Sequence, residues 1–297
     1  MRIHYMSDLH LEFGAFDKPL PRGDVLLLVG DITLLAALDP SSENYERLAR
    51  TRQRTQDFLE ACRRNFRRII YVIGNHEAYG YCLTWSPSLI RRAMADVELL
   101  DDCVIELDRK TLLVGGTLWT DMGGGRAHER IRRALNDFRL IRIEKDGQLE
   151  DFDTHDAVRC HKRTLELIGQ TAETHPSRTI VVATHHAPSV KGLSPEHVHS
   201  SPLNDAYYSD LEGFIAAYPN IRHWVHGHTH LQKAYRVAQC RVLSNARGYV
   251  MHEDCAATFD PNRWFATGCA AKRAPKRKKA PPSPGTEEPI QSSDGAR

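Results

Sequence analysis

The chain lacks the features of a secreted, disulfide-bonded or membrane-spanning protein. Its seven cysteines are odd in number and form no Cys-x-x-Cys pair, so neither a disulfide framework nor a cysteine-rich zinc site is expected. Its longest apolar runs, such as 25–29 and 180–183, are far shorter than the ~20 residues that cross a bilayer. The first residues contain no sustained apolar segment and no small-residue cleavage site, so no signal peptide is predicted. We therefore expect a cytoplasmic protein without a membrane partner.

The composition is that of a chain that folds over most of its length. Hydrophobic residues make up 41% and charged residues 26%, which is typical of soluble globular domains. The net charge of +2 is unevenly distributed, because residues 271–297 hold seven Lys or Arg against three Asp or Glu. We expect one domain over residues 1–265, followed by a disordered, basic, Pro/Ser-rich tail over 271–297. Nucleic acid is expected, if at all, only as a substrate or through this tail. The oligomeric state stays open.

Apolar runs rich in β-branched residues alternate with segments of helical periodicity, and this alternation predicts an α/β fold. Strands are predicted at 2–6, 25–29, 68–73, 111–118, 179–184, 222–225 and 234–243. Helices are predicted at 42–66, 87–97, 157–174 and 210–218. The run at 25–29 is apolar without alternation, which is typical of a strand that is covered on both faces.

Polar side chains follow five of these predicted strands, at the point where each strand ends. Such positions gather ligands in open α/β sheets. Each cluster alone is ordinary, since an Asp after a strand is more often a turn or capping residue. The clusters are Asp8-Leu9-His10, Gly30-Asp31, Gly74-Asn75-His76-Glu77, His185-His186 and Gly227-His228-Thr229-His230.

Together these clusters supply carboxylate, amide and imidazole groups, which indicates a metal site. The mixed oxygen and nitrogen set suits Mn, Fe, Co, Ni or Zn better than Ca or Mg, and the absence of Cys ligands argues against structural zinc. In an extended segment His228 and His230 would point to the same side, about 7 Å apart, and flank two neighbouring ions. We therefore expect two divalent metal ions in a catalytic site.

The order of these motifs resembles that of the calcineurin-like metallophosphoesterases, over about residues 1–249. The resemblance implies a four-layer α/β/β/α sandwich with a binuclear metal site at the strand C-terminal ends. Three further stretches look like those of bacterial members with unassigned substrates, namely 116–121, 136–138 and 245–249.

The resemblance also assigns roles to the residues. One ion would be bound by Asp8, His10, Asp31 and His230, and the other by Asp31, Asn75, His185 and His228. A bridging water or hydroxide would then hydrolyse a phosphate ester. His76 would not bind metal but would assist the leaving group, with Glu77 orienting its imidazole.

Several points stay open at this stage. His186 is the alternative to His185 as a ligand. The family's Gly-Asp motif often carries a second Asp three residues on, where this chain has Leu34. The substrate, including monoester against diester, is not encoded in these motifs. The alternative function is a non-catalytic protein-binding module of the same fold. Such members usually lack some of the metal ligands or the catalytic His, whereas this chain has a suitable residue at each of these positions.

Two further residue types receive structural predictions. The four tryptophans are expected to pack in the interior. They are Trp85, Trp119, Trp224 and Trp264. Arg247 either contacts a phosphate or forms a surface salt bridge.

Overall fold

The computed structural model describes residues 1–198 and 201–267. Residues Met1–Thr267 form one compact unit. The predicted tail at 271–297 lies outside the described residues. Among the helices of the described part, none is long and apolar enough to span a membrane.

The first sheet has five strands in the order β14-β1-β2-β3-β5. Four of them are parallel: β1 (Arg2–Met6), β2 (Gly23–Val29), β3 (Phe66–Val72) and β5 (Glu98–Leu99). The edge strand β14 (Trp264–Ala266) runs antiparallel to β1.

The second sheet has six strands in the order β12-β13-β11-β10-β7-β6. Its parallel strands are β7 (Thr111–Gly116), β10 (Thr179–Thr184), β11 (Ile221–His226) and β13 (Cys240–Ser244). The antiparallel edges are β6 (Cys103–Asp108) and β12 (Ala234–Val237).

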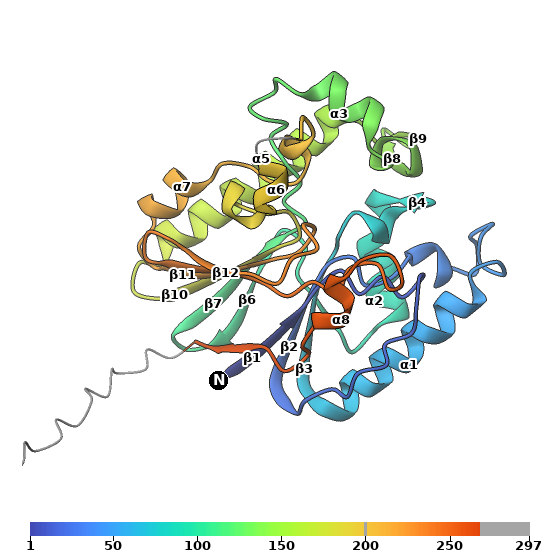
Figure 1. Ribbon diagram of the computed structural model, residues 1–297, viewed down its shortest axis with the longest axis horizontal. Helices are drawn as coiled ribbons and strands as arrows, with labels where there is room; N and C mark the ends of the chain where they lie inside the picture. The colour runs from blue at the N-terminus through green and yellow to red at the C-terminus, as the bar shows by residue number, and fades with distance from the viewer. Residues whose placement is uncertain (199–200, 268–297) are drawn as a thin grey trace, which may run out of the picture. The chain divides into compact units, whose positions relative to one another are not determined.

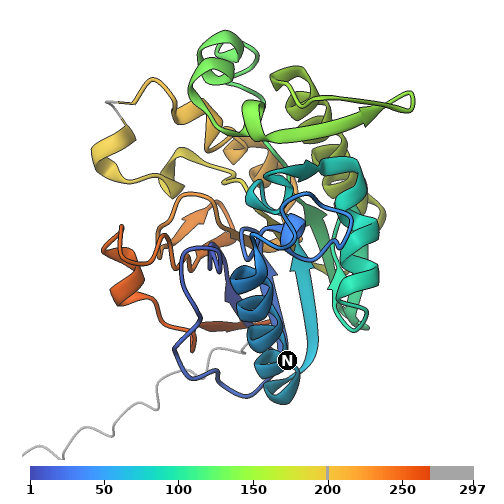
Figure 2. The ribbon, with the colours of Figure 1, turned by 90° about the vertical axis from the view of Figure 1, so that its right-hand side faces the viewer.

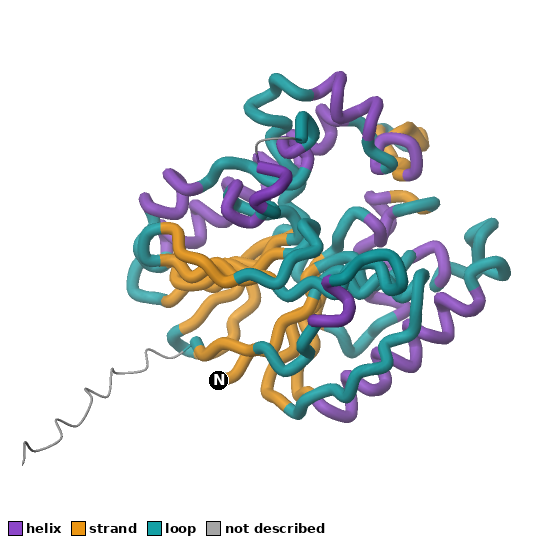
Figure 3. The backbone as a smooth tube through the Cα atoms, viewed as in Figure 1, coloured by secondary structure: helices purple, strands orange, loops and turns teal. Residues whose placement is uncertain are grey.

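Successive side chains of a strand point to opposite faces of its sheet, so each sheet contributes to two apolar clusters. In β2, Val25, Leu27 and Val29 belong to the cluster shared with the second sheet, whereas Leu26 and Leu28 pack toward helices. The helices α1 (Ala49–Asn65) and α2 (Ser86–Ala93) cover the first sheet, and α5 (Thr154–Thr174) and α7 (Glu212–Ala217) cover the second. The strands accordingly lie between flanking helices (Figures 1 and 3). The prediction of an α/β fold is confirmed.

A smaller layer lies over the strand ends, at the top of Figure 2. We call residues 117–153, 190–198 and 201–207 the cap. It contains α3 (His128–Ala134), α4 (Asp137–Leu140), β8 (Ile141–Lys145), β9 (Gln148–Asp151), η4 (Val190–Gly192), α6 (Pro195–Val198) and η5 (Asn204–Ala206). Strands β8 and β9 join β4 (Tyr81–Cys82) in a three-stranded sheet. The cap has its own apolar cluster around Trp119, Ile131 and Phe152, which its short elements did not reveal in the sequence. The remaining short helices are η1 (Leu35–Ala37), η2 (His76–Ala78), η3 (Leu83–Trp85) and α8 (Cys255–Thr258).

Several predicted elements are corrected by the structure. The predicted strand 234–243 is wrong, because it is a hairpin of β12 and β13 that turns at Ala238, which has a φ of 48°. The predicted helix 42–66 begins only at Ala49, because turns occupy the preceding residues. The packing prediction holds for Trp119 and Trp224, which are buried. It is wrong for Trp85 and Trp264, which are exposed.

Glu77 ties the ends of β2 and β3 together. Its buried carboxylate accepts hydrogen bonds from the backbone amides of Asp31 (2.8 Å), Ile32 (2.7 Å) and Gly74 (2.7 Å). It also accepts one from the Tyr71 hydroxyl at 2.6 Å. Burial and the nearby Asp31 carboxylate raise the pKa of Glu77 to about 6. The predicted role of Glu77 in orienting His76 is therefore wrong, because its carboxylate bonds to backbone amides and to the Tyr71 hydroxyl instead.

We predict that Glu77→Ala destabilises the fold, because it leaves four buried backbone amides without this acceptor, those of residues 31, 32, 33 and 74. The free energy of unfolding in urea, measured with metal chelated, should fall by about 3–5 kcal/mol. The matched control is Glu60→Ala on the exposed face of α1, which should change the value by less than about 0.5 kcal/mol. A loss in Glu77→Ala no larger than in the control would contradict this role.

Candidate metal centre

Seven side chains meet where five parallel strands end. Asp8 and His10 follow β1, Asp31 follows β2, Asn75 follows β3, His185 follows β10, and His228 and His230 follow β11. A parallel bridge between Ser7 and Ala246 joins the two sheets at this edge. Because the strands of both sheets end here, residues far apart in the sequence reach one another.

The backbone bends sharply at most of these positions. Five of the seven have left-handed backbone: Asp8 (φ 53°), His10 (45°), Asp31 (57°), His228 (64°) and His230 (50°). Such conformations cost on the order of 1–3 kcal/mol each in non-glycine residues and cluster at functional sites. The expectation that His228 and His230 lie in an extended segment is therefore wrong. Their side chains reach the site through turns instead.

Glycines let these turns approach one another. A Cβ on Gly30, which has a φ of 82°, would lie 2.3 Å from His185 Nδ1. A Cβ on Gly74 would lie 2.2 Å from Asp31 Oδ1. Neither position has room for a side chain.

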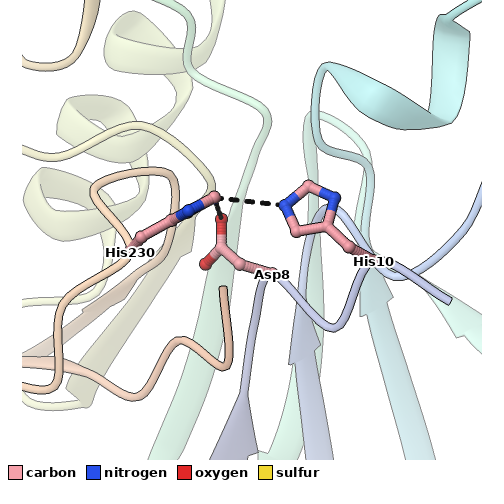
Figure 4. Close-up of side chains that lie close together, drawn as sticks. All are labelled: Asp8, His10 and His230. Atoms are coloured by element: carbon pink, nitrogen blue, oxygen red, sulfur yellow. Dashed lines mark hydrogen bonds and ion pairs between the residues drawn. The ribbon is translucent and has the colours of Figure 1, made fainter. Parts of the chain in front are cut away.

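The potential ligand atoms form three overlapping groups, each with its atoms within 4.8 Å of one another. The groups are Asp8/His10/His230, His10/Asp31/His76 and Asp31/His185/His228. In the first, His230 Nε2 lies 3.1 Å from His10 Nε2 and 3.6 Å from Asp8 Oδ1 (Figure 4).

Asp31 belongs to two of these groups. Its Oδ2 lies 3.7 Å from His10 Nε2 and 3.4 Å from His185 Nε2. Asn75 Oδ1 lies 3.0 Å from the same His185 nitrogen. His186 is in none of the groups, and its Nδ1 lies 3.3 Å from the Thr117 carbonyl oxygen. The structure thus brings His185, rather than His186, to Asp31.

Buried ligand atoms without protein partners fit a bound cation. Asp8 Oδ2 and His228 Nε2 are both buried and have no hydrogen-bond partner. Leaving buried polar atoms unpaired is costly, and where two potential ligand atoms lie together a bound cation would satisfy them. Burial and the neighbouring His186 and His185 hold the pKa of His228 well below its ordinary value, so its imidazole is neutral, the form that binds metal.

Three of the histidines have their Nδ1 atoms held. Nδ1 of His10 lies 3.0 Å from Glu12 Oε1, and Nδ1 of His230 lies 2.6 Å from Glu253 Oε2. Nδ1 of His185 lies 2.9 Å from the Val29 carbonyl oxygen. Such contacts fix the orientation of ligand imidazoles and leave each Nε2 for a metal.

The amide of Asn75 is oriented by the cap. Its Nδ2 donates to Asp137 Oδ1 at 2.8 Å, and the Tyr79 hydroxyl donates to the same oxygen at 2.6 Å. This arrangement turns Asn75 Oδ1 toward His185.

His76 lies beside the other candidate ligands, and both of its ring nitrogens have partners. Its Nδ1 lies 3.0 Å from Glu12 Oε1, and its Nε2 lies 3.2 Å from the Tyr249 hydroxyl. Its ring stacks on Tyr79 at 4.2 Å. Burial lowers the pKa of His76, but the Asp31 carboxylate and the Glu12 hydrogen bond outweigh that effect and raise it to about 9.

Glu12, Glu253, Asp137 and Tyr249 were not assigned a role from the sequence. Glu12 extends the Asp8-x-His10 spacing by two residues, a signal that could have identified it. Of the predicted alternatives for Arg247, the salt bridge is present: its Nη2 lies 3.6 Å from Oδ1 of the exposed Asp17, although Arg247 itself is buried. The same Nη2 donates to the Ala15 carbonyl at 2.6 Å, so Arg247 also fixes a loop.

A cavity of about 430 Å³ opens over these candidate ligands. Asp31, His76 and His228 line its floor, and the cap residues Asn204 and Tyr207 also line it. This volume lies within the range of about 300–1,000 Å³ of small-molecule sites.

Comparison with known proteins identifies the family. The model of the calcineurin-like phosphoesterases matches residues 1–232. A search of curated proteins finds no significant match. Among solved structures, the chain resembles phosphopantetheinyl hydrolase from Mycobacterium tuberculosis with a TM-score of 0.53 at 19% identity, covering 83% of this chain and 89% of that one.

A second similar structure is a putative 5'-nucleotidase from Staphylococcus aureus. Its TM-score is 0.45 at 16% identity, and the match covers 82% of this chain but 48% of that one. The family match spans most of the chain and includes all seven residues gathered at the strand ends. The chain therefore belongs to the calcineurin-like phosphoesterases, a family of metal-dependent hydrolases of phosphate esters.

Proposed function

We propose that this phosphoesterase uses two divalent metal ions, with Asp31 as the shared ligand, to cleave a phosphomonoester or phosphodiester. Asp8, His10, Asp31 and His230 would hold one ion, and Asp31, Asn75, His185 and His228 the other. The observation that carries the proposal is the position of Asp31 Oδ2, near His10 Nε2 on one side and His185 Nε2 on the other.

The donor set also suggests which ions suit the site. Imidazole nitrogens together with few carboxylates favour Mn, Fe, Co, Ni or Zn. Two such ions would supply Lewis acidity: they would neutralise charge on the phosphoryl oxygens and lower the pKa of the attacking water. Asn75 is a neutral ligand, so it adds no negative charge beside an incoming phosphate.

His76 would protonate the oxygen of the leaving group. Its imidazole lines the cavity over the ligands and is held on three sides by Glu12, Tyr79 and Tyr249. An orientation fixed before the substrate arrives reduces the entropy cost of the proton transfer. Glu12 would act through His76, because its carboxylate accepts from the imidazole and keeps it protonated.

The first experiment measures hydrolysis of bis-p-nitrophenyl phosphate and p-nitrophenyl phosphate after chelation and after addition of Mn, Ni, Co, Zn or Mg separately. We expect activity that returns with a transition metal and is lost in Asp31→Ala, because both ions lose a ligand. The comparison of the two substrates reports the preference for diesters or monoesters. A folded protein that is inactive with every metal would contradict the proposal and favour a protein-binding role.

A second prediction concerns His76 and Glu12. His76→Ala should lower kcat by about 10²- to 10⁴-fold, the range for a positioned proton donor, with metal content unchanged. Glu12→Gln should lower kcat by about 10- to 100-fold, as for other groups that orient a functional side chain. The exposed His175→Ala and Glu46→Gln serve as matched controls and should leave kcat unchanged.

The double variant separates the role of Glu12 at His76 from its contact with His10. If Glu12 acts through His76, Glu12→Gln should have little further effect on kcat once His76 is alanine. Additive losses in the double variant, or loss of metal in Glu12→Gln, would show that Glu12 serves the ligand His10 instead.

A further inference from the structure

A second cavity, of about 510 Å³, lies beside His76, and the proposed function assigns nothing to it. Its lining is largely apolar and comes from the loop after β1, from η1 and the turns that follow it, and from the cap. The apolar residues that line it are Phe13, Leu34, Ala36, Leu48 and Leu140.

This apolar cavity adjoins the cavity over the candidate metal ligands, because His76, Tyr79, Asn136 and Tyr249 line both. A group attached to a phosphate in the first cavity would have to pass His76 to reach the second. That is the route of the leaving group, if His76 donates the proton to it.

The rim of the apolar cavity exposes large hydrophobic side chains to water. Phe13 is 46% exposed and Leu140 is 43% exposed. Phe13 packs edge-on against Tyr249 at 4.9 Å between ring centroids, so the aromatic surface extends to a neighbour of His76. Covering these side chains with an apolar group would be favourable in proportion to the area removed from water.

Two charged side chains of this lining, Glu12 and Arg47, make hydrogen bonds within the protein, although the buried Oε2 of Glu12 has no partner. Glu12 Oε1 lies 3.0 Å from both His10 Nδ1 and His76 Nδ1. Arg47 donates two hydrogen bonds to Asn44 Oδ1, at 3.1 and 2.7 Å. The surface that the cavity presents is mainly apolar, which suits an apolar group.

We infer that the apolar cavity holds the leaving arm of the substrate, and that the substrates are phosphate esters of apolar alcohols or phenols. This inference rests on the proposed function, because it takes His76 as the proton donor to the leaving oxygen. Water adds to phosphorus and releases one proton to solvent, the bond from phosphorus to the arm's oxygen breaks, and His76 gives its proton to that oxygen. His76 then regains a proton from solvent. The products are the phosphate, or a phosphomonoester, and the apolar alcohol.

The test uses phosphonates, which cannot be hydrolysed at this bond, and measures their binding to the metal-loaded protein by calorimetry. Phenylphosphonate carries an apolar arm and methylphosphonate lacks one. The natural sequence should bind phenylphosphonate more tightly. Leu140→Asn should lower the affinity for phenylphosphonate by about 3- to 10-fold, in line with the apolar area lost. It should lower the affinity for methylphosphonate by less than about 2-fold.

The matched control is Leu149→Asn, because Leu149 on β9 is also 43% exposed but does not line this cavity. It should leave both affinities unchanged. Equal affinities of the natural sequence for the two phosphonates, or equal losses for both in Leu140→Asn, would overturn the inference. Absent hydrolysis with a retained preference for phenylphosphonate would instead overturn the proposed catalytic function and leave the apolar subsite standing.

Discussion

The burial of Asp31 among imidazoles at the junction of two sheets is the constraint on which the rest of the structure depends. A lone carboxylate in such a place is costly. Burial raises the pKa of Asp31, but His185 and His76 hold it well below its ordinary range, so the carboxylate stays ionised. The His76 backbone amide also donates to Asp31 Oδ1 at 2.9 Å. The residues that keep the Asp31 carboxylate ionised and in place are therefore the ones beside which it would bind metal.

The strained turns follow from this constraint. Each strand must deliver a polar side chain to one point within a few residues of its end, which forces left-handed backbone at Asp8, Asp31 and His228. The Glu77 carboxylate accepts from backbone amides in the turns after β2 and β3. Asp8 Oδ1 accepts from the His228 amide at 2.9 Å and so links the turns after β1 and β11. These bonds link turns that lie far apart in the sequence. Stability lost to strain is thus offset by backbone hydrogen bonds to buried carboxylates.

The ligand-type residues could be predicted because each follows a run of apolar residues, and parallel strands bring such ends together. The same apolar runs form most of the strands that build the core, so the central strands could also be predicted. The hairpin of β12 and β13 could not, because its two-residue turn at Ala238 lacks the usual Gly or Asn. Two of the groups that orient the site, Asp137 and Glu253, could not be predicted, because they act through contacts made in space rather than through sequence spacing. Only Glu12 carries a spacing signal, two residues after His10. The cap is built from elements too short to show a period.

The most direct measurement of the central claim is an anomalous diffraction map of crystals of the protein loaded with Mn, recorded at the Mn edge. The account predicts two peaks per chain, about 3.5–4 Å apart, with Asp31 between them. Asp8 and His228, whose buried atoms lack protein partners, should contact different peaks. A single peak, or two peaks that do not share Asp31, would contradict the binuclear centre.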